Sequence, residues 1–110
     1  MTRRATGVRP VIRPGGESDD SPNPSLLSMF YVYFLRLNNG KIYKGSTSDL
    51  RQRIAEHLRD KVASTRKRSP RLIGYEAYKM KSDAQRRERF LKTTEGRKLL
   101  KQQYRDVLSL

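Results

Sequence analysis

Cysteine is absent from this sequence of 110 residues, and histidine occurs only once, as His57. The absence of cysteine excludes disulfide bonds, thiolate metal sites and cysteine nucleophiles, and it fits a reducing compartment. The single histidine excludes a metal site built from several histidines. No apolar run approaches the roughly 18 residues of a membrane span, and Met1–Val11 has no apolar segment of a secretory signal. We therefore expect a cytoplasmic protein without a membrane anchor.

Acidic residues are scarce, because 11 Asp and Glu stand against 25 Lys and Arg, which leaves a net charge of +14. A compact domain with this charge repels itself, and a polyanionic partner is the simplest relief. The length suits one domain and not two. Hydrophobic residues make up 35% of the chain, so the core is small or part of the chain lies outside it. These properties favour a nucleic-acid partner and a place beside the nucleoid.

The composition changes near Met29. Every proline except Pro70 precedes it, together with the polar and glycine-rich stretch Gly15–Pro22. Such a segment buries too little apolar surface to offset the entropy lost on ordering. We predict a disordered tail over residues 1–28 and one folded domain over residues 29–110. The tail is either a genuine flexible arm or an over-extended start before Met29, and the sequence does not separate the two.

Strand signals begin directly after the tail. Phe30–Leu35 is rich in aromatic and β-branched residues, and Asn38–Lys41 contains the Asn-Gly pair typical of a hairpin turn. The returning strand is predicted over Ile42–Gly45, and a third strand over Leu72–Tyr78, after the basic loop Lys61–Arg71.

Helix signals lie between and after these strands. Capping residues before Leu50 predict a helix through about Arg59, with an apolar stripe of every fourth residue: Leu50, Ile54 and Leu58. Ser82 and Gln85 have the spacing of a capping box for a second helix. Gly96 is expected to interrupt the chain before a last amphipathic helix over Arg97–Leu108. The order ββαβαα predicts an α+β fold, a small three-stranded antiparallel sheet flanked by helices.

Arg53 and His57 lie four residues apart on the first predicted helix, so their side chains face the same way. Arg53 borders the apolar stripe instead of lying opposite it. An arginine in that place commonly extends to solvent, although its planar and permanently charged fork also suits a phosphate.

Glu88 falls with Ala84 and Leu91 on the side of the second helix that faces the core, while three arginines occupy the exposed side. A carboxylate that points inward is costly unless it is paired or holds a cation. One interpretation is a buried pair with an arginine. The other is a hard divalent ion whose coordination is completed by water and phosphate. Spacing alone leaves both open.

The predicted hairpin holds Tyr31, Tyr33 and Tyr43. Tyr33 and Tyr43 are expected near each other on one face, where aromatic packing across the strands is the ordinary explanation. Two phenols beside an arginine can instead position a water or a phosphate oxygen. The next residues allow a close backbone approach by an anion at a helix start: Gly45, Ser46 and Thr47.

Together these residues resemble the GIY-YIG nuclease superfamily, and in particular its small single-domain bacterial-type members. Tyr31-Val32-Tyr33 corresponds to the first tripeptide of the family and Tyr43-Lys44-Gly45 to the second, followed by Arg53 and, in a later helix, Glu88. Tyr31 replaces the first glycine, and Lys44 replaces the central aliphatic residue of the second motif.

The resemblance extends over about residues 29–108. The runs Tyr43–Ile54 and Glu88–Lys92 are especially close to small members of the family. It implies an endonuclease that hydrolyses phosphodiester bonds in DNA with one divalent ion, Mg²⁺ or Mn²⁺. Glu88 is then expected to hold the ion and Arg53 the scissile phosphate.

In this resemblance Tyr43 is the general base or orients the attacking water, with Tyr33 hydrogen-bonded nearby. A free phenol has a pKa near ~10, so a base role needs neighbouring cations, for which Arg53 and Lys44 are candidates. His57 is the alternative base, because an imidazole titrates near neutrality.

Basic side chains around this centre are expected to bind phosphates over a broad footprint without reading sequence. They are Lys44, Arg66, Lys67, Arg68, Arg71, Arg86, Arg87 and Arg89. We expect an enzyme selective for branched or single-stranded DNA in repair or processing, either alone or directed by a protein partner. The alternative is a non-catalytic basic module that binds nucleic acid, including RNA, and keeps the fold without the reaction.

Overall fold

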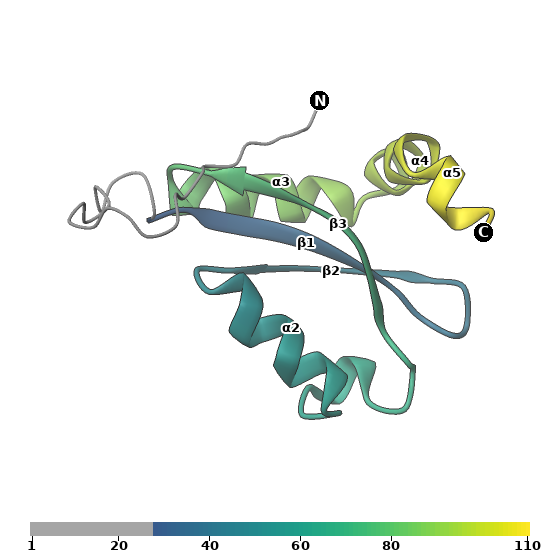
Figure 1. The fold of residues 1–110 in the computed structure, drawn as a ribbon. Coiled ribbons are helices and arrows are strands. Elements are labelled where there is room, and N and C mark those ends of the chain that lie inside the picture. The colour runs from purple at the N-terminus through teal and green to yellow at the C-terminus, as the bar shows by residue number, and fades with distance from the viewer. Residues whose placement is uncertain (1–27) are drawn as a thin grey trace, which may run out of the picture.

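The computed structural model describes residues 28–110, so residues 1–27 of the predicted tail lie outside the described residues. Three antiparallel strands form the sheet: β1 (Phe30–Arg36), β2 (Ile42–Thr47) and β3 (Arg71–Tyr78). The strand order is β2-β1-β3, so β1 is central and β2 lies at an edge (Figure 1). The predicted three-stranded antiparallel sheet is confirmed.

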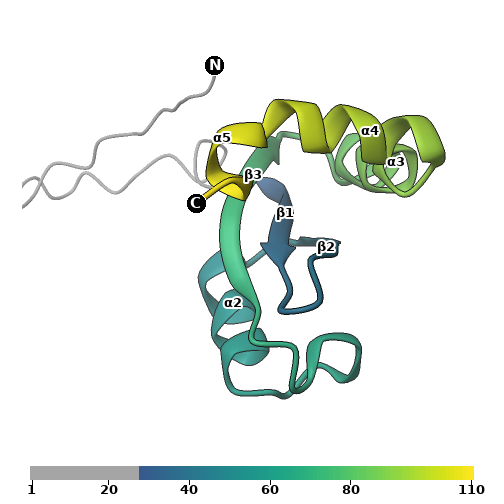
Figure 2. The same cartoon turned by 90° about the vertical axis from the view of Figure 1, so that its right-hand side faces the viewer.

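The helices of the described residues are α2 (Leu50–Leu58), α3 (Lys81–Leu91), α4 (Thr94–Gln103) and α5 (Arg105–Leu108), with a 3₁₀ turn, η1 (Ala63–Thr65). Figures 1 and 2 show α2 on one face of the sheet and α3 and α4 on the other. None of these helices combines the length and the apolar character that crossing a membrane requires. The predicted α+β order is confirmed, except that the last predicted helix is divided at Tyr104.

The central strand is buried on both faces, and Val32, Tyr33, Phe34 and Leu35 are each at most 1% exposed. Alternate side chains of a strand point to opposite faces. Val32 and Phe34 therefore enter the core under α3 and α4, while Tyr33 and Leu35 face α2. This alternation separates a purely apolar core from a face that carries phenol and imidazole groups.

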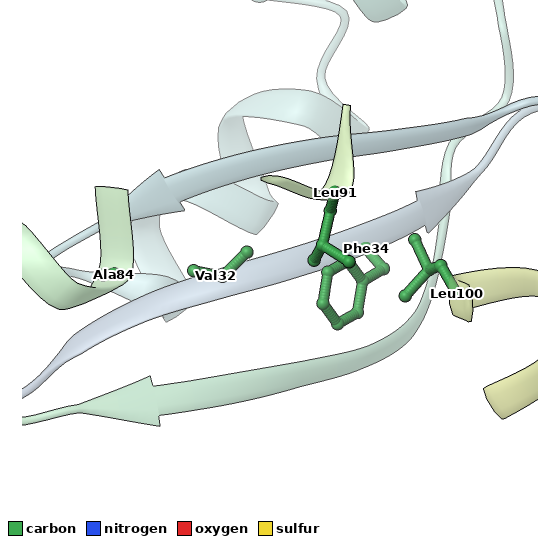
Figure 3. Packing of buried hydrophobic residues seen from close by; sticks show 5 residues of the cluster. All are labelled: Val32, Phe34, Ala84, Leu91 and Leu100. Atoms are coloured by element: carbon green, nitrogen blue, oxygen red, sulfur yellow. The ribbon is translucent and has the colours of Figure 1, made fainter. Parts of the chain in front are cut away.

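The apolar core lies between β1 and the two long C-terminal helices. Figure 3 shows Val32 and Phe34 of β1 clustered with Ala84, Leu91 and Leu100. All five are at most 1% exposed. Truncating a buried aromatic residue such as Phe34 typically costs about 3–5 kcal/mol. The core therefore fixes the sheet to α3 and α4 independently of the opposite face.

The loop between β1 and β2 is the predicted hairpin. Gly40 has φ of +85°, a conformation that favours glycine, and the Leu37 N–H donates to the Lys41 carbonyl at 2.9 Å. After β2, Asp49 caps α2, because its Oδ1 accepts from the Gln52 N–H at 3.1 Å. The Asn-Gly turn and the carboxylate cap are confirmed.

Two predicted helix boundaries are wrong. Helix α3 has Met80 as its N-cap, with no side-chain capping bond, so Ser82 lies inside the helix. Helix α4 begins before Gly96, whose N–H donates to Thr93 Oγ1 at 3.1 Å. Gly96 does not interrupt the chain. It is buried where α4 crosses the end of α3, and a Cβ there would collide with the backbone of Phe90 and Leu91.

Candidate active site

The sheet brings Tyr33, Tyr43, Arg53 and His57 together on the face covered by α2. In the register, Tyr43 lies opposite Leu35 and Gly45 lies opposite Tyr33, so both tyrosines point to the same side. Their ring centroids are 6.2 Å apart. The His57 ring lies 5.4 Å from Tyr33 and 5.1 Å from Tyr43, edge-on to both. The expected pairing of the two tyrosines is therefore confirmed.

Gly45 makes room for the Tyr33 phenol. A Cβ at position 45 would lie 2.5 Å from the Tyr33 hydroxyl oxygen, well inside contact distance. The Tyr33 ring thus crosses the backbone of β2 at a glycine, the one residue type that has no Cβ to collide with the ring. Because the Tyr33 phenol fills the space beside Gly45, the close approach to this backbone is made by a side chain of the protein itself.

Two backbone N–H groups at the helix start after Gly45 are hydrogen-bonded to side chains of the same segment. Thr47 Oγ1 accepts from the Asp49 N–H at 3.0 Å, and Asp49 in turn accepts from the Gln52 N–H. Ser46 lies on the opposite face of β2, paired in register with Val32. The side chain of Ser46 therefore lies on the other face of β2 from Gly45 and Thr47, the two residues grouped with it as the expected backbone approach for an anion.

His57 is the buried residue of α2, with 0% exposure, and both ring nitrogens have a partner. Nε2 lies 2.8 Å from the Tyr33 hydroxyl and Nδ1 lies 2.8 Å from Thr65 Oγ1. Burial, and next the positive charge of Arg53, lower the pKa of His57 below its usual value. A neutral ring accepts at one nitrogen and donates at the other. We assign the Tyr33 hydroxyl as donor to Nε2 and Nδ1–H as donor to Thr65.

The predicted apolar stripe on α2 is wrong at its last position, because the Leu58 side chain is 63% exposed. Leu50 and Ile54 are half-buried, and the helix turns His57 toward the sheet in place of Leu58. A polar side chain at this position is accommodated because the sheet supplies Tyr33 and the η1 turn supplies Thr65 as partners.

Arg53 lies at the rim of the same group, with 37% of its side chain exposed. Its Nε donates to the Tyr33 hydroxyl at 3.3 Å and its Nη1 donates to Glu56 at 2.9 Å. Both bonds raise the pKa of Arg53, the bond to Tyr33 more than the bond to Glu56. The bond that Glu56 accepts from Arg53 lowers the pKa of Glu56. A guanidinium has five N–H donors, so Nη2 keeps both of its hydrogens for another acceptor.

Tyr33 itself is poorly suited to act as a base. Burial raises its pKa to about 12, and the hydrogen bond from Arg53 only partly opposes this effect. Its hydroxyl oxygen instead joins Arg53 to His57. Of the two paired phenols, Tyr43 at the sheet edge is half-buried and Tyr33 is fully buried. Tyr33 therefore orients its neighbours.

Glu88 lies on α3, on the other side of the sheet from α2. Its side chain is 18% exposed, and its Oε2 accepts from Lys92 Nζ at 2.9 Å. Within residues 28–110 its partner is thus a lysine one turn away and not an arginine. Helix α3 packs against the edge strand β2 as well as β1. Glu88 is therefore carried by a helix that reaches the edge strand, and its hydrogen-bond partner is Lys92, outside the hydrogen-bonded group around Tyr33.

The expected phosphate-binding cations differ in their surroundings. Arg87 is not free, because it makes two bonds to Glu76 at 3.0 and 3.2 Å and stacks over Phe90 at 5.7 Å. Lys44 is paired in register with Phe34 and so faces α3 and α4, away from Tyr43. It therefore does not lie beside the Tyr43 phenol as expected.

The other expected cations are exposed: Arg66, Lys67, Arg68, Arg71, Arg86 and Arg89. Arg86 pairs with Asp83 at 2.7 Å in a surface ion pair. The loop that carries Arg66 to Arg68 is tied to the hairpin, because the Asn38 N–H donates to the Arg68 carbonyl at 2.7 Å. This loop is held in place by backbone contacts while its charged side chains remain at the surface.

Two residues of this face were not among the expected site residues. Thr65 holds the His57 ring, but nothing in its spacing from His57 signals that contact. Tyr75 is 53% exposed and packs edge-on against Tyr31, with the ring centroids 5.9 Å apart. Tyr31, Arg51, Leu72 and Tyr75 line part of an open depression of about 520 Å³. Tyr75 lies opposite Tyr33 in the register, so the depression adjoins the tyrosine group.

Comparison with known proteins points to one family. A family model described as the GIY-YIG catalytic domain matches residues 29–104. A UPF0213 protein of Staphylococcus haemolyticus is 35% identical over 77 residues, which cover 68% of this chain and 94% of that protein. A UPF0213 protein of Cupriavidus pinatubonensis is 39% identical over 66 residues, covering 58% of this chain and 73% of the relative.

Among solved structures, the solution NMR structure of a UPF0213 protein from Bacillus halodurans is similar to this chain. The two are 33% identical, and the match covers 66% of this chain and 81% of the other, with a TM-score of 0.44.

Proposed function

This chain belongs to the GIY-YIG family of nuclease domains, and from that premise we propose that it is a divalent-metal-dependent endonuclease that hydrolyses phosphodiester bonds in DNA. The observation that supports the proposal most is Arg53, which is held by Tyr33 and Glu56, still keeps donors free, and interacts electrostatically with the half-buried Tyr43. A fixed guanidinium with unused donors suits a phosphate group, because its planar fork matches two phosphate oxygens.

In the proposed reaction Arg53 binds the scissile phosphate and stabilises the charge that builds on its oxygens in the transition state. Because its Nε is already held by Tyr33, the fork needs little reorganisation when the substrate arrives. Tyr43 orients the attacking water or takes its proton.

We assign His57 a positioning role in place of the alternative base role. Its ring is 0% exposed and both of its nitrogens are engaged, so it has no open path to a water on the substrate. It acts through Tyr33, whose hydroxyl oxygen it shares with Arg53. Thr65 serves the same end one step further away by holding the opposite side of the ring.

Glu88 is the residue proposed to hold the metal. Mg²⁺ is commonly bound by one or two carboxylates, with water and substrate phosphate supplying the other oxygens. A site with a single protein carboxylate fits this chain, because residues 28–110 contain no group of three or more His, Cys, Asp or Glu able to hold an ion. Oε2 of Glu88 bonds to Lys92, and Oε1 has no hydrogen bond within the described chain. When bound there, Mg²⁺ or Mn²⁺ supplies positive charge to the phosphate and the leaving oxygen.

A panel of labelled DNA and RNA, single-stranded, duplex and branched, tests the proposal. We expect wild type to cleave DNA members with Mg²⁺, and Glu88→Gln to lose cleavage while it keeps nucleic-acid affinity. Glu95→Gln, which removes an exposed carboxylate on α4, is the matched control and should cleave normally. Normal cleavage by purified Glu88→Gln would refute the metal assignment, and cleavage of none of the panel by wild type would refute the nuclease.

A second candidate is the non-catalytic module that binds nucleic acid. The Glu88–Lys92 ion pair favours it, because that pair gives the carboxylate a structural role without a metal. This candidate predicts that wild type binds the nucleic acids of the panel tightly and that neither wild type nor Glu88→Gln cleaves any of them. It also predicts that Glu88→Gln lowers stability slightly, by about 0.5 kcal/mol or less for a pair of this exposure on one helix.

A further inference from the structure

A cluster of cations lies on the face of the sheet opposite the tyrosine group. Lys41 and Lys44 of the hairpin and Arg97 and Lys101 of α4 line one groove of about 590 Å³. The two residues on α4 are four apart, so they face the same way beside the buried Leu100. The groove therefore has cations on both walls, one wall from β2 and its turn and the other from α4.

These charges lack carboxylate partners. Within residues 28–110 the ammonium groups of Lys41, Lys44 and Lys101 make no ion pair, and Arg97 donates to the Lys92 carbonyl at 2.8 Å. Lys44 is half-buried, and burial together with the repulsion of Arg97, Lys92 and Lys101 lowers its pKa. Gathering like charges around a half-buried ammonium is unfavourable in the free protein, and an anion in the groove relieves it.

The position of the groove relative to the proposed active site is set by the edge strand. Tyr43 and Lys44 are consecutive in β2 and point to opposite faces of the sheet. Because β2 has a neighbour on one side only, nothing in the sheet covers its outer edge. A polymer that passes over this edge can therefore contact the groove on one face and Tyr43 on the other.

We infer that this groove binds the phosphate backbone of the nucleic-acid strand on one side of the cleavage point, with the strand passing over β2 between Lys44 and Tyr43. The inference rests on the proposed function, because that function supplies the nucleic-acid polymer. Of the possible polymers, a flexible single strand suits a path around the sheet edge better than a stiff duplex. The groove supplies affinity and direction without reading sequence, because its contacts are cations with phosphates.

Binding of oligothymidylates in EDTA tests the groove without cleavage. We compare a short strand of about 4 nucleotides with a longer one of about 16, which spans the usual range of single-strand site sizes. In Lys44→Gln/Lys101→Gln, affinity for the longer strand should fall by about fivefold for each contact at about 0.1 M salt, and the slope of log K against log salt should decrease by about 1.4. The affinity for the short strand, which can bind at the groove or at the tyrosine group but cannot span both, should fall less.

The matched control is Lys81→Gln/Lys98→Gln, which removes two exposed lysines from α3 and α4 that do not line the groove. It should change the slope much less. Lys101→Gln alone, at an exposed position, keeps the test valid if the variant at the half-buried Lys44 melts at a lower temperature. Equal effects of the two double variants would overturn the inference, as would a wild type that binds anionic lipid vesicles and not oligothymidylate.

The test separates this inference from the proposed function. A protein that binds the longer strand through the groove and cleaves nothing refutes the endonuclease and leaves the groove in place. A protein that cleaves DNA while the two double variants bind alike refutes the groove and leaves the endonuclease in place.

Discussion

Replacing His57 by phenylalanine is expected to destabilise the domain strongly although an aromatic ring remains. The substitution removes the acceptor of the Tyr33 hydroxyl hydrogen and the donor to Thr65 Oγ1, at two sites that are at most 1% exposed. Each buried polar group left unsatisfied costs about 1–3 kcal/mol, so the pair costs about 2–6 kcal/mol. For a domain of this size each 1 kcal/mol lowers the melting temperature by about 4–8 °C.

The pH dependence of stability should change as well. The fold lowers the pKa of His57, so the unfolded chain binds a proton more readily than the folded one. Stability is therefore fully present above the ordinary histidine pKa near 6.5 and is lost as pH falls from there through the folded value, with a slope of up to about 1.4 kcal/mol per pH unit. No other histidine contributes in this window, and the pKa of Glu56 is shifted downward, away from the ordinary histidine pKa.

Urea unfolding of wild type, His57→Phe and Tyr33→Phe between pH 5 and pH 7 measures both effects. We expect wild type to lose stability toward pH 5 and His57→Phe to be nearly flat. The double variant should lose less than the sum of the single losses, since each single change breaks the same hydrogen bond. A His57→Phe variant within about 0.5 kcal/mol of wild type, or with the wild-type slope, would refute the assigned hydrogen bonds.

Gly45→Ala should lower the free energy of unfolding by about 1–3 kcal/mol and sharply reduce cleavage, because its Cβ displaces the Tyr33 phenol. The control Gly40→Ala is strained only in the hairpin turn, so it should lower the melting temperature and keep the cleavage rate. Tyr75→Ala should weaken binding of single-stranded DNA by about 1–3 kcal/mol and duplex binding much less, if bases stack on its exposed ring; equal losses in a titration of both would contradict this. Removing divalent ions with EDTA should abolish cleavage and leave the melting temperature unchanged, because the described residues contain no group of three or more His, Cys, Asp or Glu that could hold a structural ion. Cleavage that persists in EDTA would exclude the metal.

Much of the fold follows from local sequence signals. The aromatic and β-branched run in β1, the Asn-Gly turn and the Asp49 cap each specify a local conformation that tertiary packing does not oppose. Gly96 and Ser82 mislead for the opposite reason. Gly96 is required by the close crossing of α3 and α4, which is visible only when both helices are in place, and the local capping signal at Ser82 does not decide where α3 begins.

The site was predictable in part. Tyr33, Tyr43, Arg53 and His57 could be grouped because strand alternation and a four-residue helix spacing fix which side each faces. The partners of His57 could not, since Thr65 reaches it only through the path of the η1 loop. The sequence alone does not reveal the groove, because Lys44 is adjacent to Tyr43 in sequence, whereas alternation along β2 points Lys44 toward Arg97 and Lys101.

The measurement that tests the central claim most directly is single-turnover DNA cleavage by wild type and Arg53→Lys. Lysine keeps the charge but loses the planar fork that holds Tyr33, Glu56 and the proposed phosphate. If Arg53 binds the scissile phosphate, the rate should fall by roughly 10²–10³-fold while DNA affinity and melting temperature stay close to wild type. Near-wild-type cleavage by Arg53→Lys would contradict the account and remove Arg53 from the reaction.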